Sequence, residues 1–401
     1  MIHTAPHVIA AASIAAALSC AHPAQSPNAS PAARGQVEAR SYYYSDEGGL
    51  SVWTTGARAE QQISPSVSVR ASALADQIIL KPPPPIQVVP PGPGQPTGHL
   101  HPGVDIITSA SVLAPDSSVR TEKWRFEGIA GAKLEGSLQQ QPARLEILVR
   151  GSTEPDFKSL GAWLTGEGEF FERNTTIAAF VGGGRDTIQP LLPPPGQEST
   201  WPASQARLNA GASITQLFSK ALVGSAGFGF THQWGTLWSP YRRALVNTTL
   251  FPEVLPSNRE RLTSFVALSY YLGGGTALHL RQGLYLDSWQ ILALMPEAAI
   301  AKEIGDAGLV SFRYRYYGQQ AASFYHPIYS QTLSIMSGDP RHGDLSEHVS
   351  AVELRWSLSG RPGWSRGMTL LGSYELSLLS YRQLRSSTRA QVFSLGLVWG
   401  Y

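Results

Sequence analysis

The chain has 401 residues, a formal net charge of +2 and 15% charged residues, whereas soluble globular proteins carry about 25%. The near-neutral charge argues against a nucleic-acid binder, and one cysteine excludes a disulfide scaffold or a cysteine-rich metal site. No apolar run reaches the ~18 residues that a spanning helix needs. The hydrophobic 42% of the chain must therefore follow another pattern.

Residues 1–24 predict a signal peptide for export. The apolar stretch from Val8 to Leu18 has the length of a signal-peptide h-region and is followed by small residues, although no Lys or Arg precedes it. The alternative is a buried amino-terminal helix. Cys20 stands where a lipoprotein cysteine would stand, but residues 17–19 (Ala-Leu-Ser) form a poor lipobox, so ordinary cleavage is favoured over lipidation. Residues 25–35 are rich in Pro, Ala and Ser and predict a disordered lead-in.

From residue 36 to 401, apolar residues alternate with polar or small ones, which places them on opposite faces of strands. The carboxyl terminus shows this alternation in its cleanest form. One face there carries Phe393, Leu395, Leu397, Trp399 and Tyr401. About sixteen strands (14–18) are predicted, near 36–46, 49–62, 65–79, 122–136, 142–152, 157–171, 174–186, 205–218, 221–234, 259–272, 276–287, 288–303, 308–320, 346–359, 367–381 and 388–401.

The strand and loop lengths favour a transmembrane barrel over a soluble sandwich, whose strands also alternate. Sandwich strands usually have about 5–6 residues, whereas stretches of ten or more suit tilted strands that cross a bilayer. Short turns alternate with long segments at 80–121, 187–204, 235–258 and 321–345. Because outer-membrane barrels have short periplasmic turns and long external loops, we predict an all-β, antiparallel up-and-down transmembrane β-barrel with these four segments outside.

Three segments do not fit this scheme simply. Pro296 falls inside the twelfth predicted strand, where it indicates either a bulge or a misplaced boundary. Val104 to Thr108 is either an extra strand or part of an inward-folded plug. The proline-rich tract from Pro82 to Pro93 must be extended, and we interpret it as a spacer rather than a recognition motif.

Several segments resemble the bacterial family named after domain of unknown function 3570, a family of proposed outer-membrane barrels. The resemblance covers most of residues 38–401 and is most specific at 308–330. The other segments that carry it are 42–52, 64–78, 104–112 and 173–186. This sequence departs from the family pattern in the proline insertion before His101 and at residues 295–298. The family implies a barrel fold and brings no established activity, so no functional residues are carried over.

The polar face of the predicted strands mixes charges of both signs. The predicted lumen-lining residues are Arg125, Glu127, Lys133, Glu135, Glu146, Arg150, Glu167, Glu169, Arg281, Asp287, Arg313, Arg315, Glu353, Arg355 and Glu375. Buried charges without water or partners would be very costly, so this face implies a wet channel, a network of cross-strand ion pairs, or both. The alternating carboxyl-terminal strand ending at Tyr401 resembles the signal that the barrel-assembly machinery reads.

No catalytic constellation, cofactor or metal site is predicted. His326, His342 and His348 with Asp339 and Asp344 match no metal-binding motif, so a solvated polar loop is preferred. For a lipid hydrolase, a Ser/His pair is needed. His279, which lies near strand serines, is the best of the poor candidates. The glycine runs at 182–185 and 273–276 are interpreted as strand-end and turn glycines.

We therefore expect a bacterial outer-membrane barrel that passes or binds small polar solutes. The alternative is a loop-plugged barrel that serves as a structural or surface-interaction platform, and a lipid hydrolase is the least favoured class. The expected partners are outer-membrane lipid and, during biogenesis, the barrel-assembly machinery, with no nucleic acid.

Overall fold

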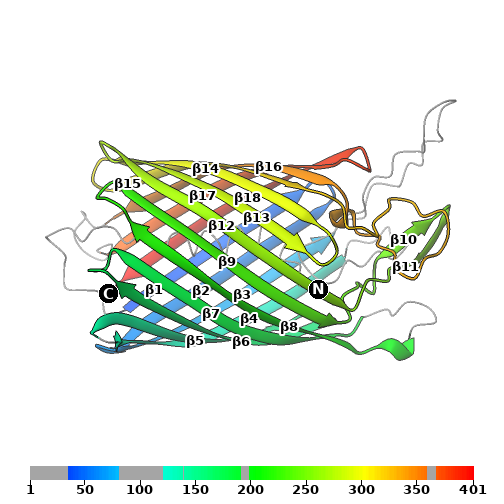
Figure 1. The fold of residues 1–401 in the computed structure, drawn as a ribbon, viewed down its shortest axis with the longest axis horizontal. Helices are drawn as coiled ribbons and strands as arrows, with labels where there is room; N and C mark the ends of the chain where they lie inside the picture. Colours follow the sequence, from blue (N-terminus) through cyan, green and yellow to red (C-terminus); the bar gives the residue numbers. More distant parts are fainter. Residues whose placement is uncertain (1–34, 81–120, 139, 191–197, 359–366) are drawn as a thin grey trace.

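The computed structural model describes residues 35–80, 121–138, 140–190, 198–358 and 367–401. Sixteen antiparallel strands close into one barrel, and two more form a separate hairpin (Figure 1). The barrel strands are β1 (Gly35–Asp46), β2 (Leu50–Ser64), β3 (Val67–Leu80), β4 (Thr121–Leu138), β5 (Gln141–Thr153), β6 (Phe157–Phe170), β7 (Thr175–Ile188), β8 (Ala203–Leu217), β9 (Leu222–Gly235), β12 (Asn258–Gly273), β13 (Thr276–Asp287), β14 (Leu292–Ile304), β15 (Gly308–Gln319), β16 (Leu345–Ser357), β17 (Met368–Tyr381) and β18 (Ser386–Gly400). The predicted fold class and strand number are confirmed.

Each strand pairs with its neighbour in the chain, with two exceptions. β9 pairs directly with β12, and β1 pairs with β18 to close the barrel. The predicted signal peptide, the proline-rich tract and the Val104–Thr108 segment lie outside the described residues.

The largest boundary error concerns the strand predicted from residue 288, because β14 begins at Leu292. Asp287 ends β13, and its Oδ1 accepts hydrogen bonds from the backbone N–H groups of Trp289 (3.0 Å) and Ile291 (2.9 Å). Gln290 has a positive φ of 69°. An aspartate that bonds to the following backbone makes a tight turn, which hydrophobic alternation alone does not reveal.

Pro296 lies within β14, and neither a bulge nor a boundary occurs there. On the β15 side the pairing passes from Leu294↔Gly318 to Glu297↔Arg315 and skips the two residues between, but the register is unchanged. Proline has no N–H to donate to the ladder, which explains the local gap.

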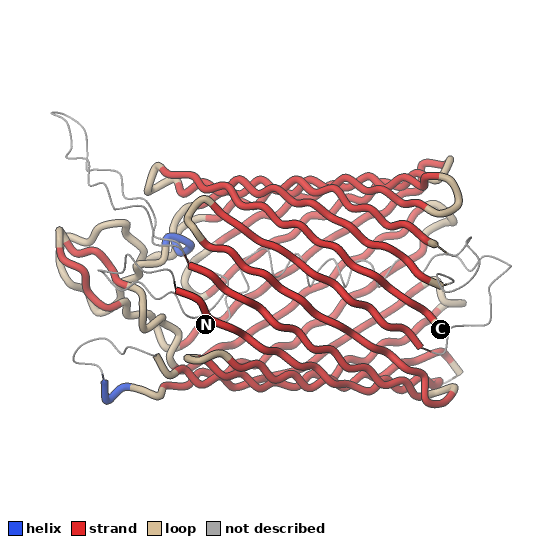
Figure 2. The backbone as a smooth tube through the Cα atoms, turned by 180° about the vertical axis from the view of Figure 1, so that it is seen from behind, coloured by secondary structure: helices blue, strands red, loops and turns tan. Residues whose placement is uncertain are grey.

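The two ends of the barrel differ. At the turn end, Gly35 and Tyr401 exchange backbone hydrogen bonds of 3.1 and 3.0 Å, and the β12–β13 turn uses Gly273, Gly274 and Gly275 with positive φ. At the loop-rich end lie the hairpin β10 (Arg243–Val246) and β11 (Thr249–Pro252) and the short helices η1 (Glu198–Thr200) and η2 (Pro340–His342) (Figure 2). The hairpin was not predicted, although Asn247, with φ of 52°, is a typical hairpin-turn residue.

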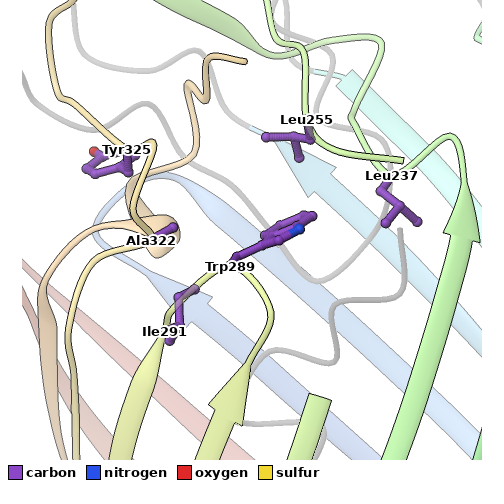
Figure 3. Packing of buried hydrophobic residues seen from close by; sticks show 6 residues of the cluster. All are labelled: Leu237, Leu255, Trp289, Ile291, Ala322 and Tyr325. Atoms are coloured by element: carbon purple, nitrogen blue, oxygen red, sulfur yellow. The ribbon is translucent and has the colours of Figure 1, made fainter. Parts of the chain in front are cut away.

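Buried apolar packing concentrates at the loop-rich end. The largest cluster contains Leu237, Leu255, Trp289, Ile291, Ala322 and Tyr325, which come from separate loops (Figure 3). Main-chain hydrogen bonds also join the hairpin region to the loop between β15 and β16, through Val254 and Met336 (2.9 and 2.8 Å). We call this assembly of loops the cap.

Candidate functional site

The barrel wall has two faces of opposite character. The apolar face carries every second residue of each strand, beginning on β18 with the residues predicted as an assembly signal. These are exposed by 46% (Phe393), 73% (Leu395), 37% (Leu397), 42% (Trp399) and 49% (Tyr401). Phe393 packs on Tyr374 of β17 with ring centroids 4.7 Å apart. Around the barrel, large apolar side chains recur on this face, so the predicted alternation holds in three dimensions.

The other face, here called the polar face, carries all fifteen residues predicted to line the lumen. The strand registers place them together: for example, Lys133 pairs with Glu146, and Arg313 pairs with Ala351, which in turn pairs with Glu375. Fourteen of them are buried or half-buried, and only Arg355 is exposed. This crowding of charge requires compensation within the wall.

On β3 to β6 that compensation is a ladder of ion pairs. Arg150 donates to Glu127 at 2.5 Å, and Arg144 donates to Glu167 at 3.0 Å. Arg70 of β3 reaches across β4 to Glu146 of β5 at 2.9 Å. Gly131 lies beneath this bridge, where a Cβ atom would stand 3.6 Å from Arg70 Cγ. Each such pair contributes about 0.2–1 kcal/mol, so the ladder stabilises the wall as well as charging it.

Arg70 and Arg144 were not among the predicted lumen residues. They continue the same period-two alternation as their neighbours, so that signal was sufficient to find them.

The wall from β12 to β17 is less evenly paired. Arg259 forms an ion pair with Asp287, and its Nε donates to that carboxylate at 2.8 Å. Arg313 donates to Glu375 at 2.7 Å and lies 3.6 Å from Glu297. Arg281 instead places its guanidinium 3.8 Å from the centre of the Phe265 ring.

The polar face of β6 to β8 combines aromatic side chains with glycine. Trp163 covers Gly182, where an added Cβ would lie 2.6 Å from the indole Cγ. Phe180 covers Gly211 in the same way, at 2.6 Å from its Cε1. The interpretation of 182–185 as strand-end glycines is wrong: Gly182 lies within β7 because the indole needs the space that a side chain would fill. The glycines at 273–275 do form a turn, as predicted.

A buried hydrogen-bond network holds the cap together. Glu253, exposed by 1%, accepts from Ser337 Oγ (2.9 Å) and from the backbone N–H of Gly338 (3.0 Å). Asp339 forms ion pairs with Arg242 and with Arg341 (2.9 Å). These contacts connect the segment around the β10–β11 hairpin to the loop before β16.

A second set of contacts connects the cap to the barrel rim. Tyr241 donates to Asp156 at 3.0 Å, and Asp156 also accepts from Lys123 of β4 at 3.2 Å. Lys123 donates to Glu154 at 2.6 Å. The rim thus anchors the cap through charged groups on β4 and the β5–β6 turn.

Burial perturbs two titratable groups of the cap. The pKa of His342 is lowered well below its usual value, first by burial and then by the nearby cations Arg259 and Arg242. His342 Nδ1 lies 2.7 Å from Ser337 Oγ. Burial also lowers the pKa of Arg242, with Arg341 as the second cause. His342 is therefore a neutral, structural member of the cap.

The other histidines that the structure describes do not gather at one site. His326 packs edge-on against Tyr329, and His348 lies on the apolar face of β16, 2.7 Å from Tyr314 Oη. Over the described ranges, no group of three or more His, Cys, Asp or Glu side chains could hold a metal ion. His279 does contact a serine, Ser269, at 2.8 Å. No carboxylate hydrogen bond to His279 occurs within the described part of the chain, so this pair lacks the third group that orients a catalytic base.

A pocket of about 440 Å³ lies across β12 to β15, around Pro296. Its lining is Val266, Ala267, Leu268, Leu280, Arg281, Gln282, Pro296, Glu297, Ala298 and Tyr314. Most of these residues belong to the apolar face by register, so the pocket opens on the outside of the wall. Separately, no helix among the described residues is long and apolar enough to cross a membrane.

Three solved structures illustrate what this barrel resembles. A bacterial polysaccharide outer membrane secretin has a TM-score of 0.50 at 9% identity, over 93% of this chain and 100% of that one. The siderophore receptor PirA from Pseudomonas aeruginosa has a TM-score of 0.43 at 11% identity, over 88% of this chain and 57% of the receptor, so this chain spans little more than half the receptor's length. The loop L8 deletion mutant of OmpT, from Vibrio cholerae, has a TM-score of 0.43 at 9% identity, over 92% and 98%.

The likeness to the secretin shows an outer-membrane β-barrel fold and nothing finer, since the identity is 9%. No curated protein matches the chain. A family model described as "Protein of unknown function (DUF3570)" matches residues 6–375, nearly the whole chain, and the predicted resemblance is confirmed. The protein therefore belongs to the DUF3570 family.

Proposed function

We propose that the protein is an outer-membrane channel for small polar solutes and that its polar face lines an aqueous lumen. The observation that carries this proposal is the separation of the two faces on a closed sixteen-strand barrel, with ion-paired charges on one face and exposed apolar side chains on the other. Barrels of this size enclose a water-filled interior unless loops fill it. Lipid contact suits the apolar face, and solute contact suits the charged one.

The strand lengths support a membrane location. β13 has 12 residues. At about 3.3 Å per residue and a tilt of about 45°, a strand of that length rises about 28 Å. This matches the apolar band of about 25 Å on outer-membrane barrels.

Conductance measurements on the refolded full-length protein in planar lipid bilayers test the proposal. We expect discrete current steps in potassium chloride, and ion selectivity that changes when Arg150 is replaced by Gln, because that leaves Glu127 unpaired. A protein that shows heat-modifiable gel mobility, and is therefore folded, but gives no current steps would contradict the channel.

The cap supports a second candidate, a closed barrel that acts as a surface platform. Its buried cluster around Trp289 and the Glu253 network make a packed structure over one end of the barrel. If the cap blocks the lumen, Trp289→Ala should raise the conductance of an otherwise silent protein. If the variant has a disrupted cap but still shows no conductance, then the cap is not what closes the lumen.

We further propose that residues 1–24 direct export and are then cleaved, with ordinary cleavage favoured over lipidation at Cys20. We also propose that the barrel-assembly machinery reads β18 together with Tyr401, which follows it. The exposed row of aromatic and leucine side chains on β18 supports this role. Mass spectrometry of the mature protein and outer-membrane fractionation of a Tyr401→Ser variant test the two proposals.

A further inference from the structure

Arg315 is a buried cation on the polar face that forms no ion pair with a carboxylate in the described ranges. Arg315 of β15 is exposed by only 9%, and its Nη2 is buried without a hydrogen-bond partner. No ion pair to Arg315 occurs among the residues that the structure describes. Its neighbour Arg313, two residues away on the same face, pairs with both Glu375 and Glu297.

The wall around Arg315 holds two further arginines. Reading across the strands, one row of paired residues on the polar face contains Arg281, Glu297 and Arg315. The adjacent row contains Arg313 and Glu375. These two rows therefore hold three guanidinium groups and two carboxylates. Arg313 contacts both of these carboxylates and Arg281 stacks on the Phe265 ring, and neither carboxylate forms an ion pair with Arg315.

A guanidinium group does not lose its proton at accessible pH, so Arg315 cannot relieve its burial by becoming neutral. A bound anion would compensate this charge. Arginine binds carboxylate and phosphate groups through two parallel N–H···O bonds, which suits an oxyanion better than a spherical ion. On the other side of Arg315, its partner in β16 is the apolar Val349. The next polar-face residue of that strand, the buried Glu347, accepts a hydrogen bond from Ser377 Oγ and forms no ion pair with Arg315.

We propose that Arg315, flanked by Arg281 and Arg313, binds the oxyanion group of a carboxylated or phosphorylated solute. This inference rests on the proposed channel function for its biological meaning, because it makes the solute anionic. It needs no conductance to be tested, since binding is a property of the folded barrel.

The test is calorimetric titration of the full-length protein in detergent with inorganic phosphate and, separately, with acetate, at constant ionic strength in chloride. We expect binding of at least one probe near one equivalent, and at least tenfold weaker binding in Arg315→Gln. Arg315→Lys keeps the positive charge but cannot form two parallel N–H···O bonds, so its affinity should lie between those of the wild type and Arg315→Gln. Arg58→Gln is the matched control, because it removes a guanidinium that is paired with Glu60 (3.0 Å) on β2 and should leave binding unchanged.

Each outcome bears on the inference. Tighter binding of phosphate or of acetate identifies which class of solute the site takes. Equal affinity in the wild type and Arg315→Gln, or no binding of either probe by the wild type, overturns the inference. Binding without conductance would support the anion site and refute the channel. Conductance without binding would support the channel and refute the anion site. Heat-modifiable gel mobility shows whether each variant is folded.

Discussion

The replacement Trp289→Ala tests whether the cap is a unit that opens independently of the barrel. Trp289 is exposed by 3%, its ring lies 5.4 Å from Phe324 and 5.2 Å from His342, and its Nε1 donates to Asn258 O at 3.1 Å. The Arg259 guanidinium lies 3.9 Å from the ring centre. Truncating a buried tryptophan to alanine costs about 3–5 kcal/mol.

That cost should appear in the cap alone, since few of its apolar contacts are shared with the barrel strands. At about 1.4 kcal/mol per factor of ten, 3 kcal/mol raises the population of the open cap roughly a hundredfold. Limited proteolysis under conditions where opening is faster than cleavage measures that population. We expect much faster cleavage in the loop before β16, with the barrel's heat-modifiable mobility intact.

The control is Trp53→Ala, because Trp53 is 52% exposed on the apolar face and takes no part in the cap. It should leave cleavage unchanged. If Trp289→Ala cleaves at the wild-type rate, or if it unfolds the whole barrel, then the cap is not the independently packed unit described above.

Three further predictions follow from the wall and the cap. Val266 lies mid-strand on the apolar face and is 60% exposed. Val266→Arg should therefore destabilise the barrel folded in lipid vesicles by about 2–4 kcal/mol relative to Val266→Ala. A cost near zero would mean that this face does not contact lipid. Gly182→Ala should lower the free energy of unfolding in urea by about 1–3 kcal/mol, because the new Cβ clashes with Trp163. Adding Trp163→Ala should restore that stability. Gly128→Ala, where nothing lies within 4 Å of the new Cβ, should leave stability unchanged. The depressed pKa of His342 means that the open cap binds a proton more readily than the closed cap. The stability of the cap should therefore fall as the pH drops below about 6.5, by at most about 1.4 kcal/mol per pH unit. His342→Gln should flatten the pH dependence of the proteolysis rate, and an unchanged pH dependence would exclude His342 as its source.

Much of the fold was accessible from the sequence because strand alternation is a local property. The apolar residues of the last strand, Phe393 to Tyr401, share a face simply because successive side chains point in opposite directions. The same rule grouped Arg313 with Arg315, and Glu353 with Arg355, before any tertiary contact was known. Turns were harder to predict from the sequence. The strand predicted from residue 288 wrongly included Trp289 and Ile291, because both residue types are typical of strands, whereas the Asp287 side chain bonds to their backbone N–H groups and makes a turn.

The chain's period-two pattern, together with the lengths of its connections, determined that a barrel wall of about sixteen strands forms, and the pattern alone determined which side chains share a face. Only the tertiary structure decided which charges neutralise each other, because ion pairing depends on strand register and on reach across intervening strands, as in Arg70 and Glu146. The same physical reason leaves Arg315 without a carboxylate while Arg313 has two, and brings Trp289 into contact with loops distant in the sequence. Those contacts span long stretches of chain, and no local pattern encodes them.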